Sequence, residues 1–192
     1  MMRIITGKAK GIRLQTLAGD NTRPTSEMAK EAVFSAIQFE TEGKKVLDLF
    51  AGSGQMGLEA LSRGAERAMF VDSAADAMDI VKANAKKTKF FDSSRFLISD
   101  YRNYIRKAAG KDSYDLIFID PPYADRSVID AVERILKAKI ANTGCIFVLE
   151  SGEYIEPKNY DIISDNFEVI KKQKYGRAFV TILRYKGDSQ VQ

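Results

Sequence analysis

The 192-residue sequence contains no histidine. This excludes Ser-His-Asp and Cys-His catalysis, and every metal site that depends on an imidazole ligand, so we expect no metal. Acid–base chemistry must therefore use Asp, Glu, Lys, Tyr or backbone groups. Cysteine occurs once, as Cys145 in an apolar run, so no internal disulfide can form. A reducing, cytoplasmic location is the expectation that follows.

Long apolar runs are also missing. No stretch approaches the length that spans a membrane, and the opening residues, MMRIITGKAKG, lack the apolar centre of a signal peptide. Hydrophobic residues make up 45% of the chain and charged residues 29%, which is typical of a folded globular protein. At this length we expect one compact domain, with or without a small appendage.

Acidic residues are absent from the first fourteen positions. Residues 1–30 carry six basic and two acidic side chains, an excess equal to the net charge of +4 of the whole chain. A basic N-terminal stretch on a chain that is otherwise neutral indicates contact with a polyanion, for which nucleic acid is the leading candidate. A solvated basic surface explains the charge equally well. The six basic residues are Arg3, Lys8, Lys10, Arg13, Arg23 and Lys30.

The first forty residues predict a hairpin followed by a helix. Residues 3–17 contain two short strand-like segments around the turn Gly-Lys-Ala-Lys-Gly. Residues 22–37 predict a helix that is entered through Pro24 and capped by Thr25 or Ser26. The apolar residues of this helix have the spacing of one buried face: Ala29, Val33, Phe34 and Ile37.

From residue 44 onward, strand-like and helix-like segments alternate. This alternation predicts a doubly wound, Rossmann-like α/β fold with a mostly parallel sheet covered on both faces. The last two segments, 167–176 and 177–185, predict an antiparallel hairpin that closes one edge of the sheet. The predicted strands are 45–50, 67–72, 95–100, 114–120 and 144–151, and the predicted helices are 58–64, 74–88, 101–110 and 126–139.

A glycine-rich loop follows the first predicted strand. Gly52, Gly54 and Gly57 complete a G-x-G-x-x-G pattern between a strand and a helix, which suits a bound nucleotide but also an ordinary tight turn. Asp48 ends the strand immediately before this loop. A carboxylate would repel a pyrophosphate and attract an ammonium group. Because S-adenosylmethionine carries an ammonium group and no phosphate, the pattern favours this cofactor over NAD.

Aspartate stands at or close to the carboxyl end of four of the predicted strands, at Asp48, Asp72, Asp100 and Asp120. Any one of them alone is more often a helix cap or a turn residue. In an open parallel sheet, however, ligands bind at the carboxyl ends of the strands. We therefore predict that Asp72 binds ribose hydroxyls and that Asp100 binds the adenine amino group beside Tyr101. The predicted cofactor-binding residues are Asp48, Phe50, Ala51, Gly52, Ser53, Gly54, Asp72, Asp100 and Tyr101.

The segment YDLIFIDPPY ends a buried strand with an unusual combination of residues. The Asp120 carboxylate and the Pro121 carbonyl offer two acceptors to an amino group, and the two prolines restrict the backbone that aims them. Tyr123 offers a ring on which a base can stack. The alternative is that Asp-Pro-Pro is only a rigid end of the strand. We predict that Asp120, Pro121, Pro122 and Tyr123 form the catalytic segment.

Several segments together resemble the class I S-adenosylmethionine-dependent amino methyltransferases, and in particular the RsmD family of bacterial 16S rRNA guanine-N2 methyltransferases. They are MRIITGKAKGIRL, RPTSEMAKEAVF, LDLFAGSGQMGLEALSRGA, FIDPPY and KYGRAFVTILRY, which span nearly the whole chain. Two residues depart from the family pattern, because Thr6 stands where a glycine is expected and Asp72 where glutamate is usual.

The resemblance implies a monomer that methylates the N2 amino group of a guanine in 16S rRNA of the small ribosomal subunit. We divide the chain into an RNA-binding extension, residues 1–40, and a catalytic domain, residues 41–192. The residues assigned to RNA are Arg3, Lys8, Lys10, Arg13, Arg23, Pro24 and Thr25. The alternatives are a DNA adenine-N6 or protein glutamine methyltransferase, a non-catalytic RNA-binding protein and, least favoured, a nicotinamide oxidoreductase.

Overall fold

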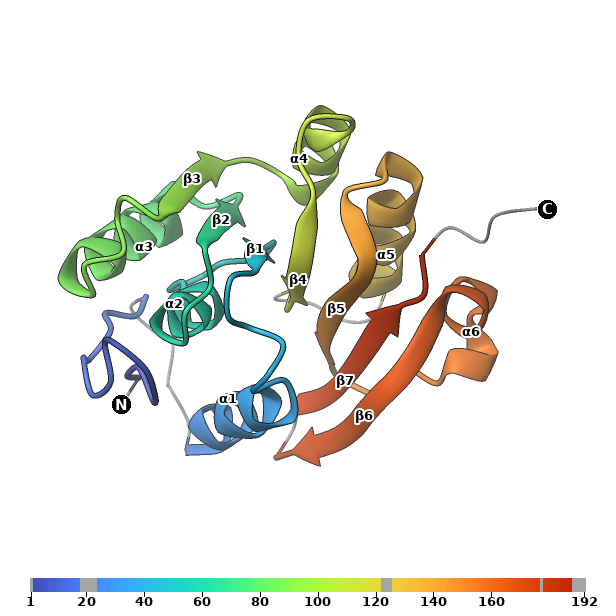
Figure 1. Ribbon diagram of the computed structural model, residues 1–192, viewed down its shortest axis with the longest axis horizontal. Coiled ribbons are helices and arrows are strands. Elements are labelled where there is room, and N and C mark those ends of the chain that lie inside the picture. The colour runs from blue at the N-terminus through green and yellow to red at the C-terminus, as the bar shows by residue number, and fades with distance from the viewer. Residues whose placement is uncertain (1, 18–23, 122–125, 177, 188–192) are drawn as a thin grey trace.

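A computed structural model describes residues 2–17, 24–121, 126–176 and 178–187, which form one α/β unit around a seven-stranded sheet (Figure 1). In spatial order the strands are β3 (Ser94–Ile98), β2 (Arg67–Asp72), β1 (Lys45–Asp48), β4 (Tyr114–Ile119), β5 (Ala141–Ser151), β7 (Ala178–Tyr185) and β6 (Phe167–Tyr175). The first five are parallel, and β7 pairs antiparallel with both β5 and β6. The predicted fold class and the predicted C-terminal hairpin are therefore confirmed.

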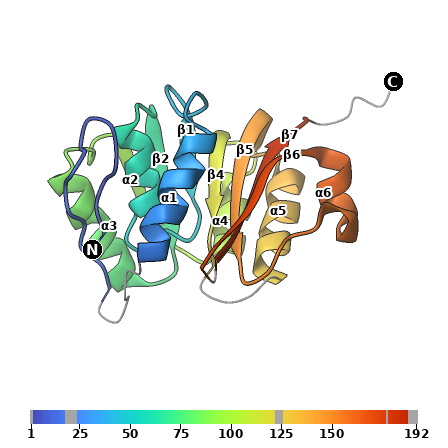
Figure 2. The same cartoon turned by 90° about the horizontal axis from the view of Figure 1, so that it is seen from below.

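Helices cover the two faces of this sheet. One face carries α1 (Pro24–Ala36), α2 (Gln55–Ser62) and α3 (Ala75–Lys87), and the other carries α4 (Tyr101–Ala108), α5 (Arg126–Ala138) and α6 (Asp161–Asn166). Figure 2 shows α1 between the N-terminal segment and the β6–β7 hairpin. In the part of the chain that the structure describes, no helix is long and apolar enough to cross a membrane.

The central strands are buried on both sides, which explains their unbroken apolar sequence. Along β4, Leu116 and Phe118 pack into the core under α1, α2 and α3, while Ile117 and Ile119 pack into the core under α4 and α5. The same alternation places Val46 of β1 on the first side. Two covered faces are what a parallel sheet with helical connections requires.

Besides shifts of up to three residues at the ends of elements, the largest at the starts of α2 and β5, the structure differs from the sequence prediction in three places. The arms of the N-terminal hairpin run antiparallel as predicted and are joined by backbone hydrogen bonds on both sides of the bridge Arg3–Arg13, but this pairing is shorter than two strands. Helix α1 begins at Pro24, so Thr25 and Ser26 lie inside its first turn and neither is the cap. The short helices at Pro157–Asn159 and at α6 were not predicted, because their sequence has no amphipathic repeat.

Candidate active site

Asp48 and the glycine loop form a packed unit at the carboxyl end of β1. The Asp48 Oδ2 atom accepts the N–H of Gly57, in the first turns of α2, at 3.0 Å. A Cβ atom at position 57 would lie 2.4 Å from the Phe70 ring and 3.3 Å from this same oxygen. The third glycine therefore allows α2 to approach both β2 and the carboxylate, and Gly54 (φ +76°) supplies the left-handed turn that begins the helix.

The Asp48 carboxyl is almost completely buried. This burial is the main reason why its pKa is raised to about 7. The hydrogen bond from the Gly57 N–H lowers the pKa, and the nearby negative charge of Asp72 raises it by a smaller amount. A positive charge placed beside this carboxyl would favour its ionised form. The site is therefore suited to a cation such as an ammonium group, and unsuited to a phosphate.

Asp72 joins the second strand to the glycine loop. Its Oδ2 atom accepts the N–H of Gly52 at 2.8 Å, and its Oδ1 atom accepts the N–H of Ala74 at 2.9 Å. The first contact holds the loop against the end of β2, and the second shapes the turn into α3. Each carboxylate oxygen can accept a further hydrogen bond, so these contacts leave room for the predicted ribose hydroxyls.

Asp100 is exposed and caps α4, because its Oδ1 atom accepts the N–H of Arg102 at 2.9 Å. The alternative that the sequence left open, a helix cap, is thus its observed role, while its contact with adenine stays a prediction. Tyr101 is buried, and its ring lies 5.2 Å from that of Phe50. Phe50, which follows β1, and Tyr101, which begins α4, therefore form an aromatic wall between the first and third strands.

Asp130 of α5 supports this wall and was missed by the sequence analysis. Its Oδ2 atom accepts hydrogen bonds from the Tyr101 hydroxyl (2.6 Å), Arg102 Nε (3.0 Å) and Arg134 Nε (2.8 Å). The Arg134 guanidinium is the main cause that holds the pKa of Asp130 well below its usual range. The i,i+4 spacing of Asp130 and Arg134 was the one local signal in the sequence; its contact with Tyr101 is long-range.

Asp120 follows β4 directly and lies at the same edge of the sheet as Asp48. The two strands are adjacent and parallel, with Phe118 opposite Asp48 and the Leu49 N–H donating to the Phe118 carbonyl at 3.1 Å. Asp120 is exposed and Pro121 is partly exposed, so both face the solvent side of this edge. The predicted site residues Pro122, Tyr123 and Arg23, and the side chains of Pro24 and Thr25, lie outside the described residues.

Buried Glu59 of α2 anchors the N-terminal segment. Its carboxylate accepts the N–H groups of Ile5 (2.7 Å) and Thr6 (3.0 Å), and it accepts Arg63 Nε at 2.9 Å. Two backbone donors of the N-terminal segment, those of Ile5 and Thr6, are therefore bound by a side chain of α2 and not by the opposite arm. The signal in the sequence was an acidic residue on the apolar face of a predicted helix.

Lys30 of α1 completes this buried group and corrects the interpretation of the N-terminal charge. Its Nζ atom donates to the Arg3 carbonyl at 2.6 Å and lies 3.8 Å from Glu59 Oε2. Burial lowers the pKa of Lys30, and Glu59 and Glu27 oppose that effect. Because Lys30 is buried, it cannot contact a polyanion, whereas Arg3, Lys8, Lys10 and Arg13 are exposed.

The N-terminal hairpin runs alongside the whole length of α2. At the glycine loop, Ser53 Oγ donates to Met2 Sδ at 3.0 Å. At the other end of α2, the Lys8 N–H donates to the carbonyl of Ser62, the last residue of the helix, at 2.8 Å. The arms of the hairpin therefore reach the candidate site, while its basic tip, Lys8 and Lys10, lies toward the edge where the parallel strands begin.

Asn84 of α3 connects the hairpin to the glycine loop. It is fully buried, and its Nδ2 atom donates to the carbonyls of Gln15 (3.0 Å) and Ser53 (2.9 Å) while its Oδ1 atom accepts the Gln15 N–H (2.8 Å). All three of these bonds join segments that are distant in sequence, so no local pattern could have revealed them.

Replacing Asn84 with alanine is expected to lower the free energy of unfolding by about 2 kcal/mol, because the buried Ser53 carbonyl and two partly buried backbone groups of Gln15 lose their partner. Urea denaturation measures the loss, and faster hydrogen exchange at the Gln15 amide locates it. The control is Asn103→Ala, at an exposed position of α4. Equal stability of the two variants would contradict the role of Asn84.

The sheet order and the acidic, glycine-rich carboxyl edge define the class: this is the fold of the S-adenosylmethionine-dependent methyltransferases. A structure described as "Putative methyltransferase yhhF from Escherichia coli" superimposes with a TM-score of 0.83 over 97% of this chain and 99% of that chain, at 22% identity.

The chain belongs to the family described as "Conserved hypothetical protein 95", which matches residues 2–184. The Bacillus subtilis protein "Putative rRNA methyltransferase YlbH" is 33% identical over 187 residues, which are 97% of this chain and 100% of that protein. The Escherichia coli protein "Ribosomal RNA small subunit methyltransferase D" is 28% identical over 167 residues, 84% of this chain and 82% of that protein. These findings confirm the family resemblance drawn from the motifs.

Proposed function

We propose that the protein transfers a methyl group from S-adenosylmethionine to the exocyclic N2 amino group of a guanine in 16S rRNA of the small ribosomal subunit. The observation that carries this proposal is the pairing of two aspartates on adjacent strands. Asp48 is buried with a raised pKa beside the glycine loop, and Asp120 is exposed at the same edge. One is suited to a bound cation, and the other to a polar group that arrives from solvent.

The residues at this edge fit S-adenosylmethionine. Asp48 would hold its ammonium group, Asp72 its ribose hydroxyls, and Asp100 its adenine amino group, with Phe50 and Tyr101 beside the ring. The loop residues Ala51, Gly52, Ser53 and Gly54 bring backbone rather than bulky side chains to the same place. When bound, this cofactor supplies an activated methyl group on a sulfonium. Among the described residues, no cluster of acidic and cysteine side chains could hold a metal ion.

The chain's own contribution to the reaction is to position the amino group. The exocyclic nitrogen of guanine is a weak nucleophile, because its lone pair is delocalised into the ring. Acceptance of its N–H bonds by the Asp120 carboxylate and the Pro121 carbonyl would hold the nitrogen in place and favour a pyramidal geometry. The proton released on methylation passes to Asp120 or to water. Catalysis of this kind depends mainly on orientation, which is consistent with a histidine-free chain.

The names of the relatives and the charge of the N-terminal segment support rRNA as the substrate. The Escherichia coli relative is named for the small subunit's RNA, and this chain presents Arg3, Lys8, Lys10 and Arg13 on an exposed segment. We propose that residues 1–40 serve as the RNA-binding extension of a catalytic domain formed by residues 41–192. In this proposal the protein acts as a monomer in the cytoplasm.

Methyl transfer from labelled S-adenosylmethionine tests the proposal. The substrates are naked 16S RNA and small subunits that lack the modification, with duplex DNA and bulk protein as controls. The expected product, identified after nuclease digestion, is N2-methylguanosine. Label in adenine or in protein would favour the alternative amino methyltransferases, and binding of RNA without any incorporation would favour a non-catalytic RNA-binding protein.

A further inference from the structure

The edge of the sheet opposite the candidate site is strongly basic. We call it the strand-start edge and define it as residues 41–45, 63–67, 86–95, 106–115 and 137–142, which precede or begin the five parallel strands. These segments hold thirteen basic and five acidic side chains. Because the whole chain has a net charge of +4, the rest of the molecule is net negative. The basic residues are Lys44, Lys45, Arg63, Arg67, Lys86, Lys87, Lys89, Arg95, Arg106, Lys107, Lys111, Lys137 and Lys139.

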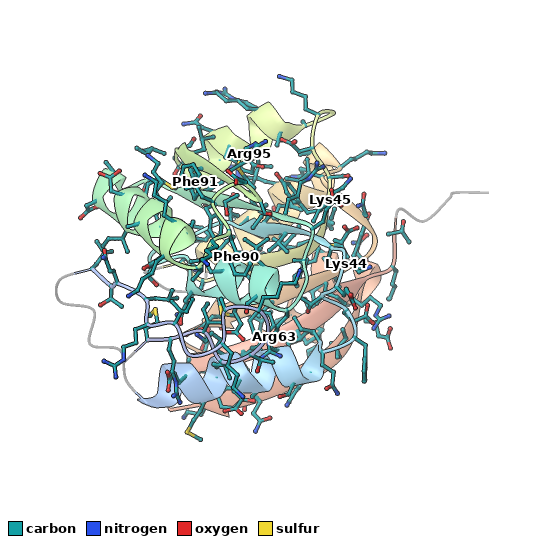
Figure 3. All side chains as sticks on the ribbon, turned by 60° about the vertical axis from the view of Figure 1, so that its left-hand side comes forward. Lys44, Lys45, Arg63, Phe90, Phe91 and Arg95 are labelled. Carbon is teal, nitrogen blue, oxygen red and sulfur yellow. The ribbon has the colours of Figure 1, made fainter. Side chains whose placement is uncertain are left out.

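Backbone contacts hold these segments side by side. Lys45 pairs with Arg67 across β1 and β2, and the Glu66 N–H donates to the Lys44 carbonyl at 2.9 Å. Figure 3 shows Phe90, Phe91 and Arg95 beside α3, with Lys44 and Lys45 to the right of them in the view. The basic residues therefore lie along one edge of the sheet, where the parallel strands begin.

Helix dipoles explain only part of this surface. A cation in the last turn of a helix is stabilised by the helix dipole, and five of the thirteen occupy such positions in α3, α4 and α5. Three more, Arg63, Lys89 and Lys139, directly follow a helix or its C-cap and benefit from the same effect. Five cations lie away from any helix C-terminus: Lys44, Lys45, Arg67, Arg95 and Lys111. Arg67 lies 3.9 Å from Glu66, and the helix dipoles do not account for any of the five.

The candidate site cannot supply the affinity for an RNA backbone. The opposite edge carries Asp48, Asp72, Asp76, Asp100 and Asp120, and carboxylates repel phosphates. A single base can enter such a pocket, but the chain that carries it must be held elsewhere.

The N-terminal hairpin links the two edges. Its arms meet the glycine loop, and its tip, with Lys8 and Lys10, meets the end of α2 next to Arg63 of the strand-start edge.

We propose that the strand-start edge is a phosphate-binding surface for a folded RNA, so that the protein holds its substrate on two opposite edges. This inference rests on the proposed function and specifies its substrate class. Strands of six residues such as β2 and β4, at about 3.3 Å per residue, separate the edges by about 20 Å. The substrate must therefore be a structured RNA that extends at least this far from the target base.

Phe91 gives this surface a second means of holding RNA. Phe91 is 38% exposed as a residue; its ring packs against that of Phe96, with centroids 5.2 Å apart, and Lys86 Nζ lies 5.2 Å from its centroid. An exposed aromatic ring among cations is a typical stacking platform for an unpaired base.

The test removes three cations from the strand-start edge in the variant Lys87→Gln/Lys89→Gln/Arg95→Gln. The matched control, Lys158→Gln/Lys171→Gln/Lys186→Gln, removes the same charge near α6 and β6, at the far end of the sheet. Binding of full-length 16S RNA is measured at several salt concentrations, without turnover. The slope of log affinity against log salt should fall by about 2 for the strand-start variant, since each lost phosphate contact removes about 0.7–0.9. The control should retain the wild-type slope.

Turnover gives a second readout. For long RNA, the KM of the strand-start variant should rise about ten-fold with kcat unchanged, whereas for a stem-loop too short to reach this edge the variant and the wild type should have equal KM. Unaltered affinity for S-adenosylmethionine shows that the variant is folded. A salt slope equal to that of the control would overturn the inference. The proposed function is judged separately, by whether the wild-type protein incorporates methyl groups into RNA at all.

Discussion

Replacement of Asp120 by alanine is expected to lower kcat for methyl transfer by about 10³-fold, while the Kd for S-adenosylmethionine changes by less than about two-fold. The carboxylate is assigned to the reacting amino group, and loss of a positioned acceptor and proton carrier typically costs 10²–10⁴ in rate. The cofactor site should remain intact because Asp120 is exposed at the end of β4, whereas Asp48 and the glycine loop are organised by contacts within β1, β2 and α2. Single-turnover kinetics and calorimetric titration measure the two quantities.

Two further variants sharpen this test. Asp120→Asn keeps one carbonyl acceptor but cannot take a proton, so its rate should fall between those of the wild type and the alanine variant. Asp165→Ala removes an exposed aspartate of α6, far along the chain from the site, and should have wild-type kinetics. A kcat for Asp120→Ala close to that of Asp165→Ala would remove Asp120 from the catalytic assignment.

The sequence predicted the sheet well because its strands are buried on both faces and therefore have unbroken apolar sequences. Segment 67–72 matches β2 at both ends, and the apolar part of 114–120 matches β4. Once the strands are parallel, the carboxyl end of each lies at one edge, so the prediction that Asp48, Asp72, Asp100 and Asp120 share an edge followed from topology alone. The glycine spacing also predicted a tight connection from strand to helix. In the structure Gly57 is needed there because a side chain at this position would clash with Phe70.

The parts that the sequence did not predict depend on contacts between distant residues. Glu59 binds backbone groups 53 and 54 positions away, and Asn84 binds Gln15 from 69 positions away. Neither glutamate nor asparagine has a sequence preference from which such a distant partner can be predicted. The contacts of Glu59 take up two backbone donors of the hairpin, whose arms pair over a shorter length than predicted. Glu59 also lies beside buried Lys30, which the count of charges had placed on the surface. The basic strand-start edge was hidden for a similar reason, because its residues come from five separate segments whose charges balance along the chain.

Asp48→Asn is expected to weaken binding of S-adenosylmethionine at least 100-fold at pH 7.5, and at the same time to stabilise the cofactor-free protein. The amide keeps an acceptor for the Gly57 N–H, so the glycine loop should retain its shape, but it offers no charge to the ammonium group. For the wild type, the affinity should fall about ten-fold for each pH unit below the pKa of about 7 at Asp48, because only the ionised carboxylate attracts the cation. The variant should lack this dependence.

The stabilisation follows from the direction of the same pKa shift. Asp48 has a higher pKa in the folded protein than in the unfolded chain, so the folded state holds the proton more tightly, and its stability falls as the pH rises from about 4 to about 7. Asparagine has no proton to lose. The free energy of unfolding of Asp48→Asn minus that of the wild type should therefore be about 2–3 kcal/mol larger at pH 8 than at pH 5. Urea denaturation without cofactor measures this difference. Parallel pH profiles for the two proteins would show that Asp48 is not a buried ionisable group, and its assignment to the ammonium would lose its physical basis. If the two stability profiles diverge with pH and the variant no longer binds S-adenosylmethionine, then the buried charge of Asp48 destabilises the free protein and is used to bind the cofactor.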